Sequence, residues 1–214
     1  MEQDQNYLKT GTTTVAVVCR DGIVMGADKR ATAGNLIVSK DVRKIFDLTL
    51  DMAVTVAGTV SDVQLLVKVT KAEIRLRELR TDRKPTVKEV ANLLGGLVYG
   101  NIRRFSVIPG VSHFILGGKD IHGFHLYDLF ADGSITEIKD YITSGSGSVM
   151  AYGVLESQYK KGMSIDEGTK LIVDAISASM QRDSASGNGV DVISITAAGL
   201  KSVYEKELNT KLSY

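Results

Sequence analysis

Three consecutive threonines that directly follow a glycine are the residues best suited to covalent chemistry near the start of the sequence. Gly11 precedes Thr12, Thr13 and Thr14, and an apolar run typical of a β-strand follows them. A threonine hydroxyl is a weak nucleophile in water and needs an adjacent base before it can attack a carbonyl carbon. The α-amine of an N-terminal threonine can be that base, because its pKa lies at about 7.7 to 8.0. Thr12 would gain such an amine if residues 1–11 were removed.

Gly11 suits a cleavage event at the bond that it forms with Thr12. Because glycine has no Cβ, the chain can adopt strained conformations there, and the Thr12 hydroxyl can approach the Gly11 carbonyl. The residue types therefore indicate self-cleavage between Gly11 and Thr12 as one hypothesis. A threonine run that leads into Val-Ala-Val-Val is also ordinary strand sequence, so these residues alone leave both interpretations open.

Other kinds of catalytic or binding site have little support in the sequence. Cys19 lies inside an apolar strand-like run, and no G-x-S-x-G motif occurs. His113 stands alone, and His122 and His125 are expected on opposite faces of one strand, so no metal site is predicted. The stretch 145–148, with sequence GSGS, lacks the lysine of a phosphate-binding loop and is typical of a tight turn before a helix. We therefore expect no cofactor.

Length, composition and charge favour one globular domain with no charged partner. The 214 residues are 43% hydrophobic, enough for a single core that buries roughly 70% of the unfolded surface. The 26 basic and 25 acidic residues are spread along the chain, so neither nucleic acid nor a membrane is an expected partner. The single cysteine cannot form an internal disulfide, so nothing requires an oxidising compartment. Residues 1–11 lack the apolar core of a signal peptide, and no apolar run approaches the ~20 residues of a membrane-spanning helix. We expect a cytoplasmic protein.

The elements that must position these residues alternate between groups of strands and pairs of helices. In chain order, apolar periodicity predicts strands at 13–19, 23–27, 36–38 and 52–56, helices from 62 and from 87, strands within 112–130 and at 134–138, helices at 149–159 and from 165, and strands at 190–196 and 201–205. Two helices begin with a capping-box pattern, at Thr86 and Ser164. Gly95, Gly96 and Gly100 predict close packing of the second helix against another layer. Because helices do not alternate singly with strands, the prediction is an α+β fold, a four-layer αββα sandwich of two antiparallel sheets with helix pairs outside.

Several further stretches occur in an order that resembles a known family. They are 28–34 (DKRATAG), Lys44 within DVRKIFDL, 56–58 (VAG), 145–153 (GSGSVMAYG) and 182–189 (RDSASGNG). Together with Gly11-Thr12 they make the chain similar to a proteasome β subunit of the archaeal type, from Gly11 to about Val203. The resemblance implies an N-terminal nucleophile hydrolase fold, with residues 1–11 as a propeptide and 12–214 as a single catalytic domain.

The resemblance assigns the reacting groups to matching residues. Thr12 would be the nucleophile after autocatalytic cleavage at Gly11, and Lys44 and Asp28 would lie beside it. A buried ammonium near Thr12 would favour an alkoxide, while Asp28 would keep that lysine charged. Gly58 would supply a backbone N–H that stabilises the oxyanion of the tetrahedral intermediate.

The remaining matches concern the amine and the substrate. Ser146, Asp183 and Ser186 would hold the N-terminal amine and a water molecule. Thr32 would align the substrate as an added β-strand. The pocket for the residue before the cut would be lined by apolar side chains of modest size, those of Ala31, Val42 and Val56. Such a pocket predicts preferred cleavage after hydrophobic residues.

As a whole, the resemblance implies a threonine endopeptidase that hydrolyses unfolded proteins through an acyl ester on Thr12. Family members work in stacked heptameric rings, so the implied partners are α subunits, other β subunits, and a regulatory ATPase that acts through the α ring. Three alternatives stay open: a non-processed structural β subunit, a small-molecule amidase with the same sandwich, and the bacterial two-component relative of the proteasome. Two departures are small, because Val149 stands where many relatives carry proline and the tail 201–214 has no catalytic match.

Overall fold

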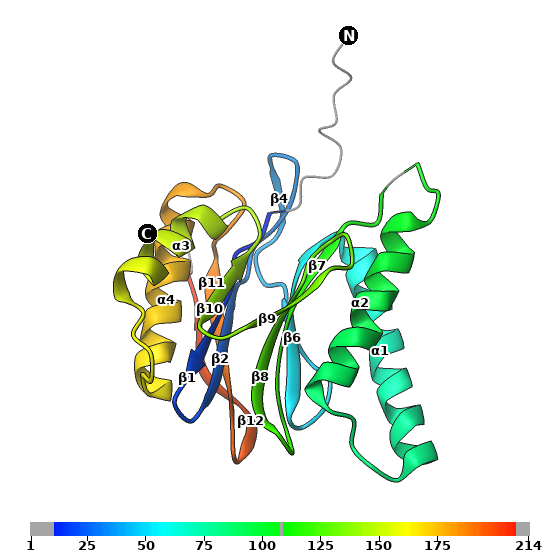
Figure 1. Cartoon of the computed structure of the whole chain (residues 1–214). Coiled ribbons are helices and arrows are strands. Elements are labelled where there is room, and N and C mark those ends of the chain that lie inside the picture. The colour runs from blue at the N-terminus through cyan, green and yellow to red at the C-terminus, as the bar shows by residue number, and fades with distance from the viewer. Residues whose placement is uncertain (1–10, 108, 209–214) are drawn as a thin grey trace.

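The computed structural model describes residues 11–107 and 109–208 of the chain. Within them, two five-stranded antiparallel sheets pack face to face, and two helices cover the outer face of each sheet (Figure 1). This arrangement confirms the predicted α+β sandwich of four layers. The expected propeptide, apart from Gly11, and the end of the tail lie outside the described residues.

The first sheet brings together the chain segments that carry most of the candidate site. Its strand order is β10-β1-β2-β11-β12. The strands are β1 Thr14–Cys19, β2 Gly22–Asp28, β10 Tyr141–Ser144, β11 Gly189–Thr196 and β12 Gly199–Glu207. Thr14 is the register partner of both Ser144 and Ala27, and Asp28 is the partner of Val190. The start of β1 therefore lies beside the ends of β2 and β10 and near the start of β11.

The second sheet has the strand order β5-β6-β7-β8-β9, and a separate hairpin joins β3 to β4. The strands are β5 Ile45–Asp47, β6 Met52–Gly58, β7 Ser112–Asp120, β8 Gly123–Leu129 and β9 Ile135–Ile138, with β3 Ala31–Ala33 and β4 Leu36–Ser39 in the hairpin. Strands β3, β5 and β10 were not predicted from the sequence. Each has only three or four residues, and strands of this length are recognised unevenly from alternation, because β4 and β9 are as short and were predicted.

The four helices form two pairs on opposite sides of the sandwich (Figure 1). Helices α1 Val60–Thr81 and α2 Val87–Arg103 cover the second sheet, and α3 Ser148–Gln158 and α4 Ile165–Arg182 cover the first. Both predicted capping boxes form, between Thr86 and Glu89 and between Ser164 and Glu167. Among the described residues, no helix is both long and apolar enough to cross a membrane.

The apolar core occupies three layers that hold the elements in place. Between the sheets, Ile23 and Met25 of β2 pack with Ile115 of β7 and are fully buried. Ile172 and Ile176 join α4 to the first sheet, in the layer outside it. Fully burying one such side chain contributes roughly 1.5–3 kcal/mol. These buried contacts therefore hold in place the strands whose ends carry the candidate site residues.

The glycines of α2 correct one prediction about packing. A Cβ on Gly95 would lie 2.5 Å from Ile135 Cδ1, so close packing is confirmed at that position. A Cβ on Gly96 or on Gly100 would have nothing within 4 Å, so both residues face open space and the prediction is wrong for both. A helix on the outside of a sandwich can press only one face against the sheet, and these two residues lie on the other face.

Candidate active site

Thr12 lies just before β1, next to the peptide bond that joins it to Gly11. Its hydroxyl donates a hydrogen bond to the Gly11 carbonyl oxygen at 2.7 Å, and its backbone N–H donates to Ser146 Oγ at 3.2 Å. The Gly11 N–H donates to Thr32 Oγ1 at 3.1 Å. Thr12 is only 6% exposed. The hydroxyl of this buried residue therefore contacts the carbonyl group at which cleavage was expected.

Two glycines allow the chain to pass through this crowded region. A Cβ on Gly11 would overlap Ala185 Cβ, closer than two carbon atoms can approach without a shift of the chain. Gly145 has φ +95°, and a Cβ there would overlap the Thr12 carbonyl oxygen. The approach of the segments 145–147 and 183–186 to Thr12 therefore depends on both glycines.

Asp28 and Lys44 form a buried ion pair beside the threonine segment. Lys44 Nζ donates to Asp28 Oδ1 at 2.6 Å, and the same oxygen accepts the Thr13 N–H at 2.9 Å. The other oxygen, Oδ2, accepts the N–H groups of Arg30 and Gly187 at 3.0 and 2.9 Å. The exposed fractions of the two side chains are 0% for Asp28 and 5% for Lys44. Four donors therefore hold the carboxylate in one orientation.

The environment of Lys44 changes its acidity. Burial lowers the pKa of Lys44 below its usual value, because the ammonium loses its hydration. The Asp28 carboxylate favours the charged lysine, as the sequence predicted, but its effect on the pKa is smaller than that of burial. Lys44 also lines the same cavity as Thr12. A lysine with a lowered pKa in this place can exchange a proton with a neighbouring group more readily than an exposed lysine.

A second cluster of polar side chains holds the backbone around Thr12. Ser146 Oγ and Ser186 Oγ each donate to Asp183 Oδ2 at 2.6 Å. Ser146 Oγ also accepts the Thr12 N–H, and Ser186 Oγ lies 2.7 Å from Thr13 Oγ1. Ser146 follows β10, whereas Asp183 and Ser186 follow α4, so the fold gathers these residues from two separate turns. Ser146 contacts the Thr12 nitrogen directly, while Asp183 and Ser186 reach it through the hydrogen bonds that they share with Ser146 and Thr13.

A cavity of about 110 Å³ opens beside Thr12, and we call it the Thr12 cavity. The substrate-binding residues expected from the sequence all line it, together with Lys44 and Gly58: they are Ala31, Thr32, Val42 and Val56. Phe46 and Gln64 also line it but were not predicted. Phe46 comes from the very short β5 and Gln64 from the first turns of α1, and no local pattern indicates that either meets Thr12. The wall is mostly apolar.

Arg30 is a further site residue that sequence reasoning missed. Its Nε donates to Asn188 Oδ1 at 2.8 Å, and its Nη1 donates to the Ser184 carbonyl oxygen at 2.8 Å. It therefore ties the end of β2 to the loop that carries Asp183 and Ser186. The sequence signal was weak, because a basic residue close to Asp28 is usually a surface charge.

The structure also shows the surroundings of Cys19, His122 and the GSGS stretch, for which the sequence predicted no nucleophilic, metal-binding or phosphate-binding role. Burial raises the pKa of the Cys19 thiol to about 12, with smaller contributions from Glu167 and Asp21, so the thiol is neutral near pH 7. His122 lies in the turn after β7, not in a strand as expected. Gly147 caps α3, so the GSGS stretch is the predicted turn before a helix. In the part of the chain that the structure describes, no group of three or more His, Cys, Asp or Glu residues is arranged to hold a metal ion.

Comparisons with known proteins show which family this chain is similar to. A family model described as "Proteasome subunit" matches residues 8–195. Relatives named "Proteasome subunit beta" occur in Archaeoglobus fulgidus, Ferroglobus placidus and Methanococcus aeolicus, and they are 42%, 44% and 42% identical to this chain over 196, 186 and 208 residues. The matches cover 92%, 87% and 97% of this chain and 90%, 87% and 94% of the respective relatives.

Proposed function

The chain belongs to the proteasome subunit family, and on this premise we propose that it is a threonine endopeptidase β subunit of the archaeal type. It removes residues 1–11 autocatalytically and then hydrolyses peptide bonds of unfolded proteins. The observation that carries the proposal is the contact between Thr12 Oγ1 and the Gly11 carbonyl oxygen, with the buried Asp28–Lys44 pair beside it.

Processing begins at the intact Gly11-Thr12 bond. The Thr12 hydroxyl oxygen attacks the Gly11 carbonyl carbon, and the bond from that carbon to the Thr12 nitrogen breaks. The hydroxyl proton is transferred to the departing nitrogen, which becomes a free amine, and Gly11 is left as an ester on Thr12. Water then hydrolyses the ester, so residues 1–11 leave with a carboxyl group. Ser146 already accepts a hydrogen bond from the Thr12 nitrogen, so the new amine stays in place.

Peptide hydrolysis repeats this chemistry on a substrate. The Thr12 amine takes the hydroxyl proton while Oγ1 attacks the substrate carbonyl, and the Gly58 N–H stabilises the negative charge that forms on the carbonyl oxygen. The leaving amine receives a proton, an acyl ester remains on Thr12, and water releases it. The Asp28–Lys44 pair lowers the cost of negative charge on Oγ1, and Ser146, Asp183 and Ser186 orient the amine.

The surroundings of Thr12 support a cleavage preference, and membership of the family supports a set of partners. The apolar wall formed by Val42, Val56 and Phe46 favours cleavage after hydrophobic residues, so a fluorogenic peptide ending in Leu should be hydrolysed faster than one ending in Arg or Glu. We further propose that the subunit assembles with α subunits and other β subunits in heptameric rings in the cytoplasm, and that an ATPase acting through the α ring delivers unfolded proteins.

The decisive experiment is the intact mass of this chain after assembly with its cognate α partner, combined with peptide hydrolysis. The wild-type chain should begin at Thr12 and be active, whereas Thr12→Ala should keep Met1 and lose hydrolysis. Thr14→Val is a matched control, because Thr14 Oγ1 is buried without a hydrogen-bond partner among the described residues and its removal should leave processing intact. Met1 on the assembled wild-type chain would indicate a structural subunit. Activity on a small amide but not on peptides would indicate an amidase.

A further inference from the structure

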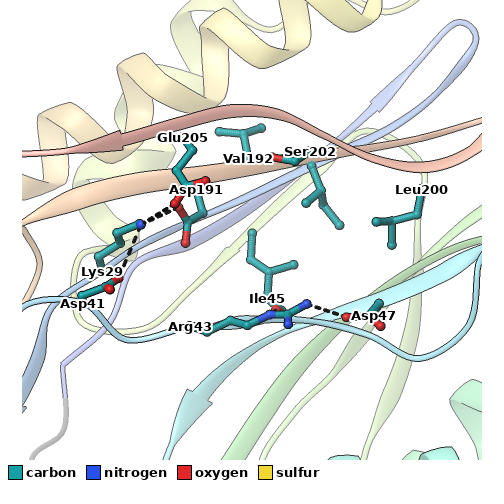
Figure 2. Close-up of a pocket in the computed structure, with 11 residues that line it drawn as sticks. Lys29, Asp41, Arg43, Ile45, Asp47, Asp191, Val192, Leu200, Ser202 and Glu205 are labelled. Carbon is teal, nitrogen blue, oxygen red and sulfur yellow. Dashed lines mark hydrogen bonds and ion pairs between the residues drawn. The ribbon is translucent and has the colours of Figure 1, made fainter.

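A second cavity, of about 310 Å³, lies between β5 and the pair β11–β12 (Figure 2). Lys29, Asp41, Asp191 and Glu205 line it, and we call it the Lys29 cavity. The segment 41–43 belongs to the walls of both cavities. Asp41 lines the Lys29 cavity, Val42 lines the Thr12 cavity, and Arg43 lines both. A contact made on one side of this segment can therefore change the position of a side chain on the other.

Lys29 is the buried charge of the Lys29 cavity. Its side chain is only 4% exposed, and its Nζ lies 3.0 Å from a Glu205 carboxylate oxygen, 3.2 Å from Asp191, 3.4 Å from Asp41 and 3.7 Å from Glu207. Figure 2 shows the ammonium between Asp41 on one side and the β11–β12 residues on the other. A buried ammonium needs such partners, because its loss of hydration is otherwise uncompensated. Of the four carboxylates, Asp41 belongs to the segment shared by the two cavities.

Two contacts join this segment to Lys29. The Val42 N–H donates to the Lys29 carbonyl oxygen at 3.0 Å, and the Asp41 carboxylate pairs with the Lys29 ammonium. A single hydrogen bond would let the segment rotate about one point, whereas a second contact at the next residue fixes its orientation. Lys29 directly follows Asp28, whose carboxylate is itself held by four donors. Val42 is thereby held in a constant relation to the catalytic groups.

We propose that Lys29 and Asp41 are positioning residues that set how Val42 meets the substrate side chain. This inference rests on the proposed peptidase function and adds a determinant of its specificity. Loosening the segment 41–43 weakens binding of a hydrophobic side chain in the Thr12 cavity. It leaves the reacting groups in place, because the polar contacts of Asp41 within the described chain are to Ser39 and Lys29 and not to Thr12 or Asp28. The effect therefore falls on KM and on the choice of substrate, with kcat preserved.

The test compares two variants that each remove one carboxylate from the same ammonium. Asp41→Asn breaks the link to the segment 41–43, and Asp41 is 71% exposed, so the variant should fold. Glu207→Gln is the matched control, since Glu207 lies at the end of β12 and pairs with the ammonium from outside that segment. For a peptide ending in Leu, we expect Asp41→Asn to raise KM about two- to five-fold, the range of a partly exposed ion pair. The preference for Leu over Glu should fall by a similar factor, and Glu207→Gln should match the wild type.

The outcomes separate this inference from the proposed function. Wild-type KM and selectivity in Asp41→Asn, or equal changes in both variants, would overturn the positioning role while the peptidase assignment stood. A fall in kcat with unchanged KM would also overturn it, because that result would place Asp41 in the chemistry. An assembled wild-type particle that keeps Met1 and hydrolyses no peptide would overturn both proposals together.

Discussion

Gly11 is constrained by space as much as by chemistry. Its backbone carbonyl accepts a hydrogen bond from the Thr12 hydroxyl, while its α-carbon lies against Ala185 in the loop that also carries Asp183 and Ser186. A side chain at position 11 would therefore disturb two parts of the proposed machinery at once. This makes the residue a sensitive place to test whether the observed geometry is the one that reacts.

Gly11→Ala should slow removal of residues 1–11 by about 10²-fold. The added Cβ would overlap Ala185 Cβ, so either the Gly11 carbonyl or the loop 183–186 must move. A displacement of roughly 1 Å between reacting groups commonly costs this factor in rate. The measurement is a time course of the intact mass of the assembled chain.

Two variants make the result specific. Ala185→Gly in the Gly11→Ala background removes the worst overlap and should restore part of the rate, because the backbone α-carbon of residue 185 would still lie 2.9 Å from the added Cβ. Gly96→Ala adds the same methyl group at a position with nothing within 4 Å and should be processed like the wild type. Processing of Gly11→Ala at the wild-type rate would show that the contact with Ala185 is absent from the reacting conformation.

At the same scale, the residues that we propose to react were easier to recognise in the sequence than the residues around them. Thr12, Asp28 and Lys44 occur in motifs that could be recognised together, and the structure brings them to one site. Arg30 and Phe46 escaped prediction for a physical reason. Their roles depend on contacts that only the folded chain creates, such as the bond from Arg30 to Asn188, 158 residues away.

Among the elements, α2 begins with a heavily bonded helix cap. Thr86 Oγ1 accepts the Glu89 N–H at 3.2 Å, Glu89 Oε2 accepts the Thr86 N–H at 2.8 Å, and Arg83 donates to both oxygens of Glu89. Replacing an N-cap threonine by alanine typically costs about 1 kcal/mol. Thr86→Ala should therefore lower the free energy of unfolding of the purified chain by about that amount. Urea unfolding at pH 7 measures it.

The same cap predicts that the free energy of unfolding decreases at acidic pH. Hydrogen bonds from Arg83, and then the Thr86 N–H, lower the pKa of Glu89 from 4.5 to about 2. Because the folded-state pKa is the lower one, this contribution to stability is complete above pH 4.5 and is lost as the pH falls towards 2. The side chains of Arg83 and Glu89 are 56% and 32% exposed, so screening by solvent keeps the effect small. Glu89→Gln should lose less stability than the wild type between about pH 7 and about pH 3, whereas Glu73→Gln on α1 should follow the wild type. An equal loss of stability at acidic pH in the wild type and both variants would contradict the role given to Glu89.

Element prediction succeeded where a segment was long enough to show its period. The helix predicted from residue 62 corresponds to α1, whose buried residues Val63, Leu66 and Ile74 recur at helical spacing. Among the strands of three or four residues, β4 and β9 were predicted and β3, β5 and β10 were missed, because so few residues carry little periodicity. The prediction of close packing was wrong at Gly96 and Gly100, because a glycine in a helix looks the same in the sequence whether it faces a sheet or solvent.

The whole molecule depends on how its two sheets are held together, and a polar contact crosses between them. His113 on β7 of the second sheet bonds through Nδ1 to Ser144 Oγ of β10 in the first sheet at 2.6 Å, and through Nε2 to Asp128. Ser144 directly precedes the turn at Gly145 and Ser146 that holds Thr12. The contact therefore links the sandwich to the site at its edge.

His113→Leu should destabilise the purified chain by about 1–3 kcal/mol, because it leaves the Ser144 hydroxyl and the Asp128 carboxylate without this partner in a largely buried place. Urea unfolding at pH 7 measures the change. His122→Leu, in the exposed turn after β7, is the matched control and should change stability little. Equal stability of the two variants would mean that the apolar layer alone sets the spacing of the sheets. A specific loss in His113→Leu would mean that a polar contact also fixes the sheets in register, at the end of the sandwich where Thr12 must react.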